Sequence, residues 1–207
     1  MTTARMIGGA LLVGLGLAAM PSANPAMAQA SDWPCVQRLV PQLEAGQMWS
    51  GPALPALGDQ QPPPEVHMLA ERLADVKTAP ETVEAEVKTF ADGQPADQRQ
   101  TALSQLFAVA FDRLNSERSI LIGGIKHYAR GQRLLAEKVA AETREAQALS
   151  QQPTPDAARL DDLQTTRAWD TRVFTDRQRQ LRLVCDQPVL VEQRAFALAR
   201  IIQDQLK

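Results

Sequence analysis

The chain has 207 residues, with 22 Lys and Arg against 24 Asp and Glu, and a formal net charge of −2. This near balance removes the attraction on which nucleic-acid binding or anchoring to an anionic membrane depends, so we expect neither as the main partner. Aromatic residues make up 4% of the chain and no alternation of apolar and polar residues persists, which argues against β-strands. The composition and patterning therefore predict an all-α protein.

The first 28 residues have the three parts of a cleavable secretory signal peptide. Arg5 supplies a positive start, an apolar run follows from Met6 to Met20, and Ala26-Met27-Ala28 offers small residues before the cleavage point. The alternative is an uncleaved anchor, but the apolar run is shorter than the roughly 20 residues that a bilayer requires. We expect removal of residues 1–28, export to a bacterial periplasm and no stable membrane insertion afterwards.

The sequence contains two cysteines, Cys35 and Cys185. In an oxidising compartment an even number of cysteines indicates a disulfide, whereas two thiols alone cannot complete a zinc site. Their wide separation in sequence also excludes a Cys-x-x-Cys redox pair. We therefore expect a structural disulfide that ties the start of the mature chain to a point near its end.

Residues 29–64 differ from the rest of the chain, because prolines recur through them and no apolar period is sustained. Each proline removes a backbone N–H donor, so no regular helix can run through this segment. It is nevertheless too apolar for a solvating linker, and it carries Trp33 and Trp49. These features predict an extended arm that lies along a helical body and is tied down at Cys35.

From residue 65 onward apolar residues recur at helical spacing, which predicts a helical domain over 65–207. Prolines and glycines divide this domain into five expected helices, at about 65–77, 80–91, 97–149, 157–185 and 188–205. The third helix has a seam at alternating steps of four and three residues from Phe107 to Leu149, which is typical of coiled-coil packing. Gly123-Gly124 and Asn115-Ser116 are the points where this long helix could bend.

A proline-containing turn over 151–156 joins the third and fourth expected helices, and the fourth helix repeats the seven-residue seam. Two such helices joined by a short turn should fold back as an antiparallel hairpin. In that register Phe174 lies beside Gln132, and Arg167 comes within reach of Glu142. We expect Glu142 and Arg167 to form a structural ion pair that helps to fix the register.

No catalytic motif is present in the sequence. It has neither Gly-x-Ser-x-Gly nor a glycine-rich phosphate loop, and neighbouring acids such as Asp161-Asp162 point in different directions on a helix. His67 and His127 lack the converging ligands that a metal site requires. We therefore expect no catalytic residue, no metal and no cofactor, and predict that the protein is not an enzyme.

The polar stretch from Arg113 to Arg118, with residues further along the same helix, could face the arm and its tryptophans. Aromatic rings beside arginines suit a small anionic or sugar ligand, but they also anchor protein interfaces and pack in cores. All three interpretations stay open for the candidate binding residues, which are Trp33, Trp49, Arg118, Tyr128 and Arg130.

Two functions fit these observations. The first is an exported accessory or adaptor protein that acts through protein–protein contact, because a long hairpin offers an extended surface. The second is a small-ligand-binding module with its site between the tryptophan-bearing arm and the long helix. Homodimerisation through the heptad faces also fits the pattern, and the sequence does not identify a partner.

Overall fold

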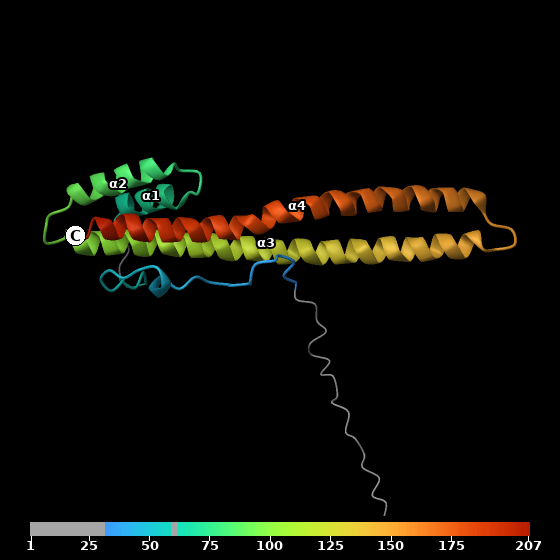
Figure 1. Cartoon of the computed structure of the whole chain (residues 1–207), viewed down its shortest axis with the longest axis horizontal. Coiled ribbons are helices and arrows are strands. Elements are labelled where there is room, and N and C mark those ends of the chain that lie inside the picture. The colour runs from blue at the N-terminus through green and yellow to red at the C-terminus, as the bar shows by residue number, and fades with distance from the viewer. Residues whose placement is uncertain (1–31, 59–61) are drawn as a thin grey trace, which may run out of the picture. The chain divides into compact units, whose positions relative to one another are not determined.

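The computed structural model describes residues 32–58 and 62–207, and the predicted signal peptide lies outside them (Figure 1). In chain order the described elements are the 3-10 helix η2 (Ala45–Gln47) and the α-helices α1 (Pro64–Ala74), α2 (Pro80–Asp92), α3 (Arg99–Ser150) and α4 (Ala157–Asp204). No strand occurs in this part of the chain, which confirms the all-α prediction. Among the described helices, none combines enough length with enough apolar residues to cross a membrane.

α3 and α4 pack side by side as an antiparallel hairpin, as the matching seams predict (Figure 1). The side-chain amide of Gln132 donates to the carbonyl of Phe174 at 3.2 Å, so these predicted neighbours do face each other. Asp156 is the N-cap of α4, and its carboxylate accepts from the N–H of Arg159 at 3.0 Å. Both the hairpin and its register are therefore confirmed.

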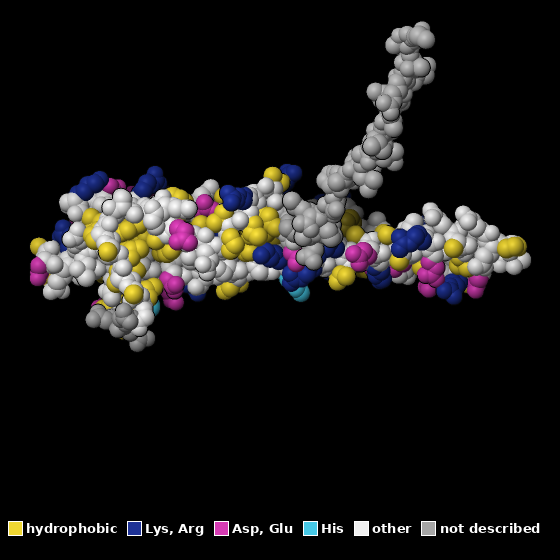
Figure 2. Space-filling model, turned by 90° about the horizontal axis from the view of Figure 1, so that it is seen from below, with side chains coloured by type: hydrophobic (Ala, Val, Ile, Leu, Met, Phe, Trp, Pro, Cys, Tyr) yellow, Lys and Arg dark blue, Asp and Glu magenta, His cyan; other side chains and the backbone are white. Residues whose placement is uncertain are grey.

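The apolar core lies at one end of the hairpin, where α1 and α2 pack against the first part of α3 and the last part of α4 (Figure 1). Several large side chains there are completely buried, including Leu73, Val83, Leu103, Phe107 and Leu198. We call residues 134–182 the distal hairpin. On the face shown in Figure 2, hydrophobic side chains gather over the core end, whereas charged groups and single hydrophobic side chains are scattered along the distal hairpin.

α4 continues through Pro188, where the sequence predicts that one helix ends and another begins. That prediction is wrong. A proline inside a helix has no N–H for the carbonyl four residues earlier, here that of Val184, and its ring clashes with that carbonyl. Gln37 donates to the carbonyl of Cys185, and Gln187 donates to that of Leu183 at 3.3 Å. α4 therefore bends near its middle rather than ending there (Figure 1).

The predicted disulfide ties the arm to α4. Cys35 and Cys185 are bonded, with their Cα atoms 5.6 Å apart. From this point the arm follows α3 toward the core end (Figure 1). Buried Leu43 is held there by Asn115, whose side chain accepts from the N–H of Leu43 at 2.9 Å and donates to its carbonyl at 3.1 Å. The amide of Asn115 thus replaces the backbone partner that an extended segment otherwise lacks, and the docked arm is confirmed.

Candidate interaction site

The two tryptophans of the arm are both half-buried. Trp49 stacks on Phe107, with ring centroids 4.4 Å apart and an angle of 8° between the planes. Its indole N–H donates to the carbonyl of Pro52 at 2.7 Å, and the indole N–H of Trp33 donates to the carbonyl of Gln37 at 2.7 Å. Their hydrogen-bonding capacity is therefore used inside the arm itself.

Met48–Pro52, the segment around Trp49, is fastened to the last turns of α4 by Gln203. The side-chain amide of Gln203 donates to the carbonyl of Met48 at 3.2 Å. Its oxygen accepts from the N–H of Ser50 at 2.8 Å and from the hydroxyl of Ser50 at 2.6 Å. One glutamine thus holds both sides of the segment and fixes the position of the Trp49 ring.

The candidate residues Arg118 and Tyr128 also contact the protein itself. Arg118 is only 5% exposed, donates to the carbonyl of Val40 and lies 3.4 Å from the carboxylate of Glu192. The hydroxyl of Tyr128 donates to the carbonyl of Arg177 at 2.8 Å and so joins α3 to α4, and burial raises the pKa of Tyr128. Arg118 and Tyr128 therefore fix the arm and the hairpin in place.

Arg130, the last candidate, pairs with the first described residue of the arm. The carboxylate of Asp32 lies 2.9 Å from Arg130 and 2.6 Å from Arg133, and hydrogen bonds from Arg133 and then Arg130 lower the pKa of Asp32. The contacts of Trp49 and of Arg130 with α3 are separated by 23 residues, or about 34 Å of helix. The five candidate residues therefore do not form one site.

The expected ion pair between Glu142 and Arg167 is not formed: none of the ion pairs among the described residues joins these two. Lys138 instead lies 3.7 Å from Glu142 and 2.6 Å from Asp170, so that one cation serves two carboxylates. The hydrogen bond between Lys138 and Asp170 raises the pKa of Lys138 and lowers that of Asp170. Lys138, one turn earlier on the same helix, already lies beside the carboxylate of Glu142. A bond from Glu142 across the hairpin to Arg167 is therefore unnecessary.

Four large apolar side chains of α3 and α4 that the site prediction did not include are at least 65% exposed. They are Ile120 (74%) and Leu134 (67%) on α3, and Trp169 (65%) and Leu183 (67%) on α4. Each stands one residue before a seam position, and the two on each helix are separated by two heptads. The signal that could have revealed them is this pair of apolar residues outside the seam on each helix, although the position midway between them is polar (His127 on α3 and Asp176 on α4).

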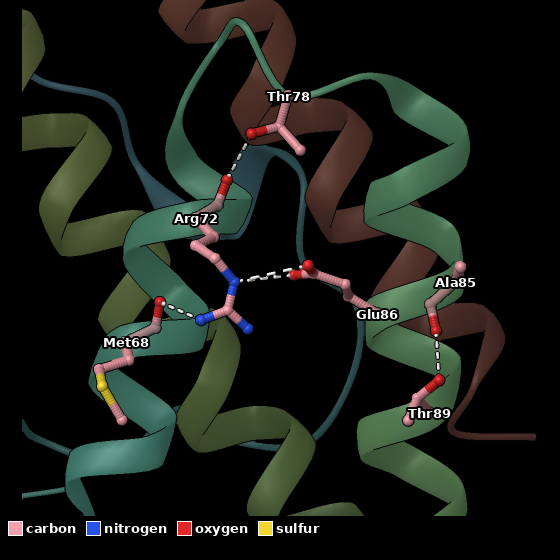
Figure 3. Close-up of polar contacts among 6 residues, drawn as sticks. All are labelled: Met68, Arg72, Thr78, Ala85, Glu86 and Thr89. Atoms are coloured by element: carbon pink, nitrogen blue, oxygen red, sulfur yellow. Dashed lines mark hydrogen bonds and ion pairs between the residues drawn. The ribbon is translucent and has the colours of Figure 1, made fainter.

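A groove of about 620 Å³ lies between α1 and α2 (Figure 3). Its lining includes Leu69, Ala85 and Phe90, and Arg72 reaches across it to lie 3.3 Å from Glu86. The hydroxyl of Thr78 donates to the carbonyl of Arg72 at 2.9 Å and closes the end of α1. The groove thus presents apolar walls with one ion pair between them.

The described residues contain no group of three or more His, Cys, Asp or Glu side chains placed to hold a metal ion. Fold and surfaces together define a class of protein, an all-helical hairpin with a disulfide-tied arm. Comparison with known proteins gives no match, since no family model, no curated protein and no solved structure is similar to this chain.

Proposed function

We propose that this protein is an exported accessory or adaptor protein that acts through protein–protein contact along its hairpin. The observation that carries this proposal is the exposure of Trp169 on the distal hairpin, where this residue is 65% exposed. Tryptophan has a large side chain with a mostly apolar surface. It is enriched among the residues that contribute most of the binding free energy at protein interfaces.

The position of the core supports the same proposal. The buried core cluster includes no residue of α3 beyond Leu114 and no residue of α4 before Val191. The distal hairpin therefore does not help to enclose that core, and a pair of helices buries only the seam between them. Its outer faces are free to serve as a contact surface.

Export is proposed from the sequence of residues 1–28, and the disulfide is compatible with it. A bond between Cys35 and Cys185 forms and persists in oxidising compartments such as the periplasm or the extracellular space. We therefore propose that the protein meets its partner in the periplasm.

The proposal is tested by comparing the proteins that the tagged chain captures after crosslinking in cells. Trp169→Glu places a charge on the exposed hairpin surface. Met68→Glu is the matched control, because Met68 is an exposed apolar residue on α1. A partner should be captured by the wild type and by Met68→Glu and be lost with Trp169→Glu, while circular dichroism shows equal helicity. Retention of the same partners by all three proteins would contradict a contact at Trp169.

A second candidate function, binding of a small amphipathic ligand, is favoured by the groove between α1 and α2. Its volume of about 620 Å³ falls within the range of small-molecule sites. Arg72 and Glu86 would orient a polar end while Leu69 and Phe90 contact an apolar body. Thermal shift measurements with single-chain amphiphiles test this function. A stabilisation that Arg72→Ala abolishes supports it, and a flat response across the panel counts against it.

A further inference from the structure

The four exposed apolar residues lie on the side of the hairpin that faces away from the arm. Asn115 and Cys185 each follow a seam residue directly, and both contact the arm. Equivalent heptad positions of two antiparallel helices therefore share a side in this hairpin. Residues such as Ile120 and Leu183, which precede a seam residue directly, turn toward the opposite side.

On α3 the exposed side carries a second seam. It consists of Ile120, Gly124, His127, Gly131 and Leu134, at alternating steps of four and three residues. A Cβ added at Gly124 or Gly131 would meet nothing within 4 Å, so no contact with the described residues requires a glycine at either position. Glycine weakens a helix relative to alanine but lets another backbone approach closely.

On α4 the same side carries a seam of the same length. It consists of Trp169, Val173, Asp176, Gln180 and Leu183. The bonds from Tyr128 to Arg177 and from Gln132 to Phe174 fix how the two helices are aligned. In this alignment Ile120 and Leu183 lie within about one helical turn of the same level, as do Leu134 and Trp169.

We propose that a second copy of the chain covers this side of the hairpin, with α3 of each copy on α4 of the other. The proposal deepens the proposed function and rests on it, since it names the partner of the hairpin surface as another copy of the same chain. A two-fold axis parallel to the hairpin places Ile120 opposite Leu183 of the second copy, and Leu134 opposite Trp169. The two hairpin turns then lie at the same end of the dimer.

Complementarity along the two seams selects this arrangement. Gly131 faces Val173 and Gly124 faces Gln180, so a larger side chain of one copy meets an open position of the other. His127 faces Asp176, and an imidazole N–H can donate to a carboxylate. A two-fold axis across the hairpin would instead place α3 on α3, with the two Asp176 carboxylates opposite each other.

The first test uses the purified mature chain alone, so that no other protein contributes. Sedimentation velocity over a concentration series should show a dimer that dissociates on dilution. Leu134→Glu and Leu183→Glu should weaken the dimer by at least about tenfold, because each buries a charge. Met68→Glu should leave it unchanged, and circular dichroism should show equal helicity for all variants. A wild type that stays monomeric, or a dimer insensitive to both changes, overturns the proposal.

The second test distinguishes the two arrangements. His127→Asp alone should weaken the dimer, because it sets two carboxylates opposite each other. Adding Asp176→His in the same chain should restore the dimer, because each exchanged residue again meets its complement. With α3 on α3 the double variant would keep like residues opposite each other, so failure to restore association overturns the proposed arrangement. A monomeric chain that still loses a captured partner with Trp169→Glu would refute this inference and leave the proposed function standing.

Discussion

Gly51 allows the arm to close over the Trp49 ring. A Cβ at this position would lie 2.7 Å from one ring carbon of Trp49 and 3.0 Å from Cδ1 of Leu206. Gly51→Ala should therefore lower the free energy of unfolding by about 1–3 kcal/mol, as overpacking does. Urea denaturation followed by circular dichroism measures the change. Gly46→Ala is the control, since its Cβ would meet nothing within 4 Å, and equal losses for both variants would contradict the role of Gly51.

Asp32 should make the attachment of the arm sensitive to acid. Hydrogen bonds from Arg133 and Arg130 hold its pKa below the ordinary value of 3.8. A carboxyl whose pKa is lowered by folding stabilises the folded state above its unfolded pKa, and this contribution is lost as the pH falls through its folded pKa. Asp32→Asn should therefore melt below the wild type at neutral pH. The two melting temperatures should converge as the pH falls below 3.8, and a constant difference would contradict the pairing.

The candidate binding residues show why the site could not be predicted from their types. Trp33, Trp49 and Arg118 each donate to a carbonyl of the arm, at Gln37, Pro52 and Val40. An arm with little regular structure has many carbonyls that lack backbone donors, and side chains can satisfy them. The sequence identifies the donors but does not reveal that the arm uses them.

At the scale of the element, Lys138 should be one of the cations that stabilise the distal hairpin. Lys138→Ala leaves the carboxylates of Glu142 and Asp170 close to each other without a cation between them, which should increase local opening. Arg167→Ala is the control, since Arg167 makes none of the ion pairs in the described part of the chain. Hydrogen exchange should show faster exchange in the distal hairpin for Lys138→Ala only. Equal exchange in the two variants would contradict this assignment.

A substitution at Gly124 of α3 should change the stability of the monomer and the formation of the proposed dimer in opposite directions. Gly124→Ala adds a Cβ in open space and should stabilise the monomer by up to about 1 kcal/mol. The same methyl group lies in the second seam and should weaken the proposed dimer. Denaturation at low protein concentration and sedimentation at high concentration measure the two effects, and a loss of monomer stability would contradict the first.

The helices themselves were largely predictable, because the period of the seams survives in the structure. α3 and the start of α4 lie close to their predicted bounds, and Gln132 meets Phe174 as expected. Pro188 was misjudged because a local rule treats proline as a stop. Such a rule takes no account of contacts with the rest of the protein, such as the bond from Gln37, which is remote in sequence, to the carbonyl of Cys185 just before the proline.

For the whole molecule, the disulfide should be the largest single contribution to stability. It closes a loop of 150 residues, for which the loss of chain entropy predicts about 4–5 kcal/mol. For a domain of this size, that free energy corresponds to a decrease in melting temperature on the order of 10 °C after reduction. Calorimetry of the oxidised and reduced protein tests this, and Cys35→Ser with Cys185→Ser is the matched variant. Equal melting temperatures would contradict a stabilising role.

The position of the two cysteines also sets the order of events during biogenesis. A chain is synthesised from its N-terminus, so Cys35 is made first and stays a thiol until the residues up to Cys185 have followed. Covalent closure thus requires nearly the entire polypeptide, and a molecule truncated before residue 185 cannot complete it. Every oxidised molecule is for this reason one in which α3, the turn and α4 as far as Cys185 have been synthesised.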